Sequence, residues 1–153
     1  MFFISLRCVS ARFLLTTAIA LGAVIALQGP ALAAKPKQKV FPSPESAVEA
    51  FVQALRGHDE KALFILLGPG SEPLISSGDA VDDRERRETF VQLYDEKNRL
   101  ETTKGKKVIV HVGNKDWPFP IPIVKTGANW RFDTKQGKEE ILNRRIGENE
   151  NEA

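Results

Sequence analysis

Three side chains have the types used in general acid–base catalysis: His111, Tyr94 and Asp133. His111 lies in the alternating segment 108–112, on the strand face opposite three valines, and a curved sheet would place that face in a concavity. No acid–base partner stands beside it in the sequence, and a histidine alone is weak evidence for catalysis. A small-molecule enzyme with a cone-type pocket, using these three residues, is therefore the alternative hypothesis.

Aromatic and charged residues near the end of the chain could contact a ligand. Trp117 and Trp130 could stack on a sugar, but at alternating strand positions we interpret them as core residues. Arg131 and Asp133 share one strand face and could form an ion pair or line a pocket; a surface pair contributes at most about 1 kcal/mol. The candidate binding residues are His111, Tyr94, Trp117, Trp130, Arg131 and Asp133.

Motifs for other chemistry are missing from the sequence. There is no metal-ligand spacing, phosphate loop, dinucleotide glycine pattern or nucleophile elbow. We interpret His58 as a solvated residue between two helices, and Asp79 and Asp116 as turn residues. We therefore predict no metal, no cofactor and no catalytic residue.

The first 34 residues have the composition of a secretory leader. Arg7 and Arg12 give a basic start, residues 13–27 are almost wholly apolar, and Ala31 and Ala33 form the small-x-small pattern that precedes cleavage. This run of 15 residues is shorter than the ~20 that a membrane span needs. We therefore expect cleavage and a periplasmic or secreted protein, which meets the membrane only through an uncleaved leader.

Removal of the leader makes the chain neutral. The whole sequence has 22 Lys and Arg against 20 Asp and Glu; the leader has two arginines and no acid, which leaves 20 of each. Nucleic-acid binding requires a basic face, so nucleic acid is excluded as a partner. The single cysteine, Cys8, lies in the leader, so the folded part depends on its core without disulfides.

Helical spacing follows a linker at residues 35–41. Ser43, followed by proline, predicts the start of a helix that ends at Gly57. Asp59 caps a second helix, which is apolar on all sides and therefore buried, and which ends at Gly68.

A charged helix and a set of strands come next. A short apolar segment and a turn occupy residues 74–79, and a helix over residues 83–97 carries charges that we interpret as a solvated face with internal ion pairs. From residue 99 the spacing alternates, as in strands. The predicted strands cover residues 99–103, 106–112, 116–124 and 130–133.

The strand at residues 116–124 has proline at three alternate positions. Its apolar residues Trp117, Phe119, Ile121 and Ile123 share one face. Pro118, Pro120 and Pro122 have no N–H to donate, so we expect one edge to pair and the other to face solvent, protected by the prolines.

We predict a single α+β domain over residues 42–147. Three N-terminal helices pack on an antiparallel meander of about four strands, and a short helix at residues 139–146 follows and ends at Gly147. Residues 148–153 are expected to form a disordered tail. The element order is similar to the nuclear-transport-factor-like cone.

Five segments resemble one family. They are Phe-Pro-Ser-Pro at 41–44, Ile-Ser-Ser-Gly-Asp at 75–79, Asp-Trp-Pro-Phe-Pro-Ile-Pro at 116–122, Trp-Arg-Phe-Asp at 130–133, and Gly-Lys-Glu-Glu-Ile-Leu-Asn-Arg-Arg-Ile-Gly at 137–147. Together they are similar to the bacterial exported family of domain of unknown function 2950. The resemblance implies an envelope protein without an assigned activity, and it supplies no catalytic residue.

The resemblance also implies that this chain corresponds to the N-terminal part of its relatives. Family members usually continue with a second segment, and residues 147–151 differ from their usual Gly-Arg-Asn-Glu-Leu. We expect an exported module that binds an envelope protein or a small ligand without catalysis.

Overall fold

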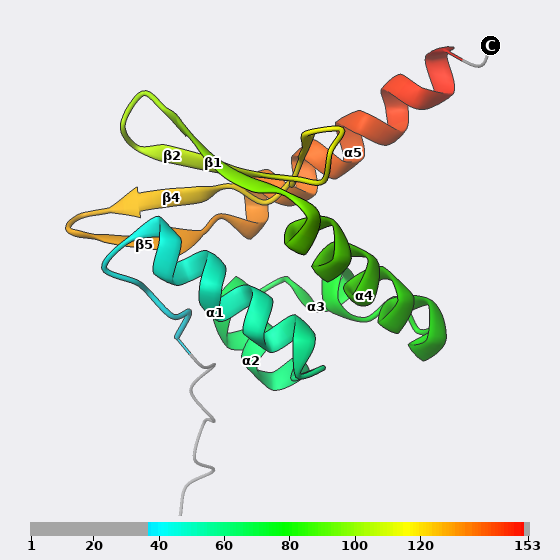
Figure 1. Cartoon of the computed structure of the whole chain (residues 1–153), viewed down its shortest axis with the longest axis horizontal. Helices are drawn as coiled ribbons and strands as arrows, with labels where there is room; N and C mark the ends of the chain where they lie inside the picture. The colour runs from blue at the N-terminus through cyan, green and yellow to red at the C-terminus, as the bar shows by residue number, and fades with distance from the viewer. Residues whose placement is uncertain (1–36, 152–153) are drawn as a thin grey trace, which may run out of the picture. The chain divides into compact units, whose positions relative to one another are not determined.

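The computed structural model describes the backbone of residues 37–151 and the side chains of residues 37–147; the predicted leader lies outside this part. Within it, four helices come first, a five-stranded antiparallel sheet follows, and one long helix comes last (Figure 1). The helices are α1 (Pro44–Arg56), α2 (Glu60–Leu67), α3 (Glu72–Ile75), α4 (Ala80–Glu96) and α5 (Thr134–Asn151). The strands are β1 (Asn98–Thr103), β2 (Lys107–Val112), β3 (Trp117–Pro118), β4 (Ile123–Thr126) and β5 (Asn129–Phe132). The predicted α+β class is confirmed, with one more helix before the sheet and one more strand than predicted.

Helix α1 begins and ends where its caps predict. The Ser43 hydroxyl accepts the Ser46 N–H at 3.2 Å, and the Ser46 hydroxyl accepts the Ser43 N–H at 3.3 Å, which completes a capping box. The apolar face of the helix enters the core. Its buried residues are Ala47, Val48, Phe51, Val52, Ala54 and Leu55.

Helix α2 is buried on one side only. Asp59 caps it as predicted, accepting the Ala62 N–H at 2.9 Å. Leu66 is buried, whereas Ile65 is 41% exposed, so the prediction that this helix is buried all round is wrong. The helix packs against α1, α3 and β5, and these elements leave its Ile65 side in solvent.

The turn before α4 is more structured than predicted. The short helix α3 covers the first two residues of the segment 74–79, which was predicted as an apolar segment and a turn, and α4 starts at Ala80 rather than at residue 83. Asp79 caps α4, accepting the Val81 N–H at 2.9 Å, and buried Asp83 accepts the Ser77 N–H at 2.9 Å. The hydrogen bond from the Ser77 N–H is the main reason that the pKa of the Asp83 carboxyl is below its ordinary value.

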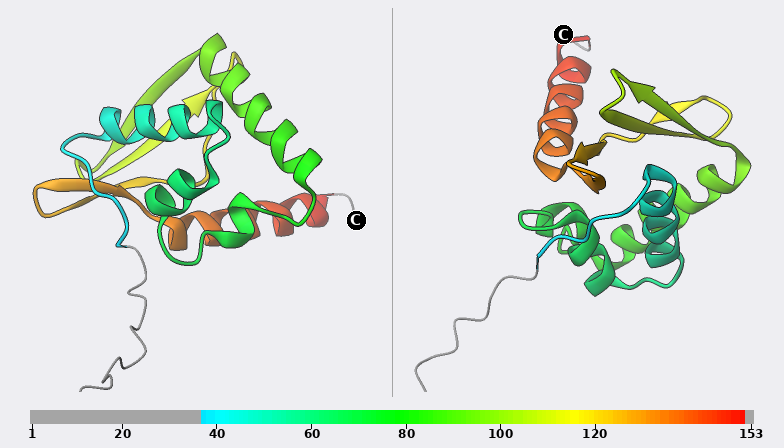
Figure 2. Two further views of the ribbon diagram at one scale, coloured as in Figure 1. Left: turned by 90° about the horizontal axis from the view of Figure 1, so that it is seen from below. Right: turned by 90° about the vertical axis from the view of Figure 1, so that its left-hand side faces the viewer.

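The sheet has the order β1-β2-β4-β5, and β3 also pairs with β2. Val108, Val110 and Val112 of β2 are buried toward the helices, and His111 lies on the opposite face, as predicted. Helices α1 to α4 gather on one side of the sheet, and α5 runs beside the sheet and past it (Figure 2).

The proline segment is interrupted rather than continuous. Pro118 pairs with His111 and Ile123 pairs with Val108, so four residues of this segment face two residues of β2. The Phe119 N–H donates to the Val110 carbonyl at 2.7 Å, so the prolines lie along the edge away from β2, as predicted. The prediction that this edge faces solvent is wrong. Arg144 donates to the Pro118 carbonyl at 2.9 Å, and the Asp133 N–H donates to the Pro122 carbonyl at 2.8 Å.

Residues 38–41, predicted to be part of a linker, belong to the folded domain. The Gln38 side-chain amide donates to the carbonyls of Leu67 at 3.0 Å and Phe132 at 2.7 Å. Phe41 is buried and forms an isolated β-bridge with Trp130, with N–O distances of 2.8 and 2.7 Å. The domain therefore begins before residue 42.

Helix α5 is longer than predicted at both ends. It starts at Thr134, where Asp133 accepts the Gln136 N–H at 3.1 Å, and it continues to Asn151 instead of ending at Gly147. A glycine inside a helix costs only about 1 kcal/mol relative to alanine, which does not by itself end a helix. Residues 148–151, predicted to be disordered, are helical.

Candidate functional site

His111 belongs to a charged cluster on the outer face of the sheet. Its Nε2 lies 3.1 Å from a Glu101 carboxylate oxygen, and its Nδ1 lies 3.1 Å from the Asp116 carbonyl and 3.2 Å from the Arg99 guanidinium. Arg99 also donates to both Asp116 carboxylate oxygens, and these bonds lower the pKa of Asp116. The side chain of His111 is only 11% exposed. The cluster joins β1, β2 and the turn at residues 113–116 through its own hydrogen bonds.

The three proposed acid–base residues have separate surroundings. Tyr94 stacks on Phe90 with ring centroids 6.5 Å apart, and burial raises the pKa of its hydroxyl. Asp133 caps α5, and its carboxylate also accepts the Gln136 side-chain amide at 2.8 Å. Among the described residues, no hydrogen bond or ion pair joins any two of His111, Tyr94 and Asp133.

The two tryptophans differ in burial. Trp117 is 42% exposed, packs edge-on against Phe119 at 6.4 Å, and has the Arg144 guanidinium 5.6 Å from its ring. The interpretation of Trp117 as a core residue is therefore wrong. Trp130 is partly buried against the core, with the Lys125 ammonium 5.9 Å from its ring.

The sequence suggested that Arg131 could form an ion pair with Asp133, but the structure shows no such pair between these two described residues. Its guanidinium donates to the Gln38 side-chain oxygen at 3.2 Å and to the Thr126 hydroxyl at 3.2 Å. Asp133 is occupied by the cap of α5. Arg131 therefore helps to hold the N-terminal segment on β5.

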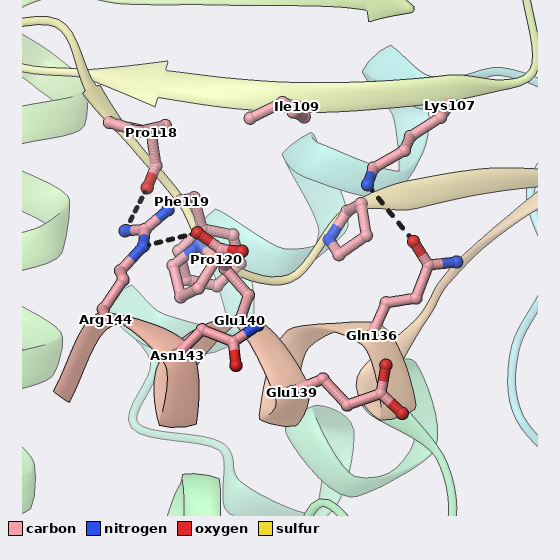
Figure 3. A pocket seen from close by; sticks show the side chains of 11 residues that line it. Lys107, Ile109, Pro118, Phe119, Pro120, Gln136, Glu139, Glu140, Asn143 and Arg144 are labelled. Atoms are coloured by element: carbon pink, nitrogen blue, oxygen red, sulfur yellow. Dashed lines mark hydrogen bonds and ion pairs between the residues drawn. The ribbon is translucent and has the colours of Figure 1, made fainter. Parts of the chain in front are cut away.

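A small cleft of about 350 Å³ lies between α5 and the proline segment (Figure 3). Polar side chains of α5 face proline rings and the outer face of β2 across it. Lys107 donates to the Gln136 side-chain oxygen at 3.2 Å, and Arg144 donates to Glu140 at 2.8 Å. The lining residues are Lys107, Ile109, Pro118, Phe119, Pro120, Pro122, Gln136, Glu139, Glu140, Asn143 and Arg144. Both cations of the cleft are thus held by protein groups.

A larger concavity of about 900 Å³, here called the apolar groove, lies on the helical side of the sheet. Its floor consists of the core residues Phe51, Leu55, Leu63 and Leu67. One wall is α4, with Phe90 and Leu93, and the other wall consists of Trp117, Phe119, Pro120 and Ile121 with Ile141 of α5.

The charges at the rim of the apolar groove are mostly engaged within the domain. Arg86 pairs with Asp82 one helical turn away, as the charge pattern predicted. Arg87 is different: its side chain is 11% exposed and donates to Glu60 at 2.8 Å and to the Ile75 carbonyl at 2.7 Å. The groove therefore combines an apolar interior with a rim of fixed charges, and His111, Tyr94 and Asp133 are not among the residues that line it.

The sequence pointed to only one residue of the apolar groove as a binding residue. Trp117 was a candidate binding residue, but Leu93 and Ile141 were not. The sequence of α4 could have indicated its wall, because this helix has few apolar side chains on the face that packs against the domain. Nothing local in the sequence indicates that Ile141 faces the same space.

Between residues 37 and 151, none of the helices has the length and apolar composition needed to cross a membrane. In the same range, no group of three or more histidine, cysteine or acidic residues could hold a metal ion.

Comparison with known proteins decides the family. Residues 38–153 match the family described as protein of unknown function (DUF2950). The chain belongs to this family. Neither a curated protein nor a solved structure matches it significantly. The match begins at Gln38, the residue whose side chain ties the N-terminal segment to the domain. The similarity to the nuclear-transport-factor-like cone stays a prediction.

Proposed function

We propose that this DUF2950 chain is a non-enzymatic binding module of the cell envelope, which holds an apolar helical segment of a protein partner. The apolar groove carries the proposal, because a concavity of about 900 Å³ lined mainly by apolar side chains is open beside an exposed tryptophan. Concave sites lined mostly by apolar side chains are the usual places where proteins bind a ligand or a partner segment.

The length of the apolar groove favours a helix over a small molecule. Its α4 wall extends from Asp82 to Glu96, which is about 21 Å at 1.5 Å per residue. Its volume is at the upper end of the range for small-ligand pockets, which is roughly 300–1,000 Å³. An amphipathic helix with apolar side chains one turn apart fits such a long, open shape.

The separation of the acid–base residues supports binding rather than catalysis. His111 lies on the sheet face opposite the groove, and Asp133 caps α5. Tyr94 lies on α4 but has no charged partner within the groove, and its raised pKa keeps the hydroxyl protonated at neutral pH.

The cellular location is proposed from the sequence. We infer that the leader is cleaved after Ala33, which gives a protein starting at Ala34, or after Ala34, which gives a protein starting at Lys35. The intact mass of the protein from a periplasmic extract tests this. A full-length species confined to the membrane fraction would contradict it.

Site-specific photo-crosslinking tests the binding proposal. A photo-reactive amino acid replaces Thr89, an exposed residue lining the apolar groove, and in a matched chain it replaces Thr102, an exposed residue of β1. We expect protein adducts in intact cells from position 89 and none from position 102. Equal crosslinking from both positions, or crosslinking to neither, would contradict the proposal; adducts with a small molecule alone would indicate a ligand instead of a protein.

A further inference from the structure

An apolar ridge lies on α5, next to the apolar groove. Leu142 is 57% exposed and Ile146 is 48% exposed, and their spacing of four residues places them on one side of the helix. We call these two residues the α5 ridge. They are among the most exposed large apolar side chains in the described part of the chain.

The ridge and the groove adjoin each other on the same helix. Ile141 lines the apolar groove, and the next residue, Leu142, belongs to the ridge. Each copy of the chain therefore carries an apolar helix side and an apolar groove close together. In a two-fold symmetric dimer, each copy can present its ridge to the groove of the other, and both surfaces leave water at once.

Charges of opposite sign lie beside the ridge and on the α4 wall of the groove. Arg145 lies between the ridge residues in sequence and forms no ion pair with any described residue. The α4 wall of the groove contributes Glu85 and Glu96, which also form no ion pair within the described part. Arg145 of an inserted α5 ridge would meet Glu85 and Glu96 on the α4 wall of the groove. This attraction favours α5 over an acidic helix as the segment bound in the groove.

We propose that the partner in the apolar groove is the α5 ridge of a second copy of this chain. The proposal rests on the binding function proposed above and names its partner. Helix α5 of each copy lies against α4 of the other, with Leu142 and Ile146 as the inserted side chains.

Sedimentation of the purified chain without its leader tests the dimer. We expect reversible dimerisation at roughly 10–100 µM, the range of a modest interface. Leu142→Glu places a charge on the ridge and should weaken the dimer roughly tenfold or more, as for a central interface residue. Asn143→Glu adds the same side chain at the next position, on the small-cleft side of α5, and should leave the dimer intact.

A mixing experiment identifies the surfaces. The double variant Glu85→Lys, Glu96→Lys reverses the two carboxylates of the α4 wall and leaves the ridge intact, whereas Leu142→Glu leaves the groove intact. Each variant alone should be monomeric, and their mixture should form a heterodimer with one ridge in one groove. Circular dichroism confirms that both variants fold.

The outcomes separate this inference from the proposed function. A chain that stays monomeric at every concentration, while position 89 crosslinks to another protein in cells, overturns the second copy but leaves the binding function standing. A dimer that survives Leu142→Glu overturns the ridge as the occupant. No dimer and no groove-specific crosslink would overturn both.

Discussion

Gly137 of α5 lies so close to Ile121 of the proline segment that a β-carbon on the glycine would be 2.7 Å from Cγ1 of Ile121. It would also be 3.1 Å from the Cα of Ile121, which belongs to the backbone and cannot rotate away. A glycine inside a helix is unfavourable by about 1 kcal/mol relative to alanine, so this one is explained by close packing. The contact holds the start of α5 on the interrupted strand.

We therefore expect Gly137→Ala to lower the free energy of unfolding by about 1–3 kcal/mol, because overpacking outweighs the gain in helix propensity. Gly147→Ala is the matched control in the same helix, where a β-carbon meets no atom within 4 Å. It should raise stability by up to about 1 kcal/mol. Urea unfolding of both variants measures the difference, and two variants that shift in the same direction would show that α5 does not pack on Ile121.

Neighbouring residues of α2 test its one-sided burial. Leu66→Ala should lower the free energy of unfolding by about 2–5 kcal/mol, because Leu66 is buried in the core. Ile65→Ala should cost less than about 1 kcal/mol, because Ile65 is 41% exposed. Thermal melts compare the two, and a loss below about 1 kcal/mol at Leu66 would contradict the position of this helix.

Asp83 should make stability depend on pH. Its pKa is lowered in the folded state, chiefly by the hydrogen bond from the Ser77 amide, so its stabilising effect is present above the unfolded value near 3.8. The effect is lost as the pH falls from that value through the lowered folded pKa. Asp83→Asn should therefore melt at a lower temperature than the wild type at pH 7, and the difference should narrow below about pH 4.

Asp82→Asn is the control for Asp83, because Asp82 is only partly buried on the same turn of α4 and its carboxylate pairs with Arg86. It should change the melting temperature little at either pH. A constant difference between Asp83→Asn and the wild type from pH 7 to pH 3 would contradict the role given to the Asp83 carboxylate.

The aromatic residues of the proline segment should differ in importance. Phe119 contacts Phe51 and Phe90 with ring centroids 5.3 and 5.0 Å apart, so Phe119→Ala should cost about 3–5 kcal/mol. Trp117 is 42% exposed and contacts Phe119 at its edge, so Trp117→Ala should cost less. Chemical unfolding ranks the two variants, and the reverse order would show that Trp117 lies in the core.

The prolines should not be needed to prevent strand pairing between molecules. Arg144 and the backbone of Asp133 already donate to the outer edge of the segment. A variant with threonine at positions 118, 120 and 122 should therefore sediment like the wild type over the same concentrations. New oligomers in this variant alone would show that the edge is accessible.

Much of the fold could be predicted because its signals are local. Ser43 and Asp59 cap helices through residues only three positions away, and the β1–β2 hairpin is closed by adjacent residues. The side of the strand on which each proline lies also follows from alternation alone, and Phe119 donates to β2 accordingly. The interruption of that strand was not predictable, because it arises from the mismatch between two paired segments rather than from either one.

The candidate site was harder to predict for the same reason. The apolar groove combines α4, the proline segment and Ile141, which come from three separate stretches of the chain. His111 was placed on the correct face, but the charged groups around it come from β1 and a turn. The residue types of His111, Tyr94 and Asp133 indicated possible acid–base chemistry. Which side chains come together depends on the tertiary structure, and these three do not.

The hydrogen bond from Gln38 to Phe132 has a kinetic consequence. The two residues are 94 positions apart, and the neighbouring bridge between Phe41 and Trp130 spans almost the same length. The β1–β2 hairpin can form as soon as its residues are available, whereas the N-terminal segment must wait for β5. We therefore expect the first folded residues of the chain to be among the last fixed, so a nascent chain keeps this end open until nearly all of the domain has been synthesised.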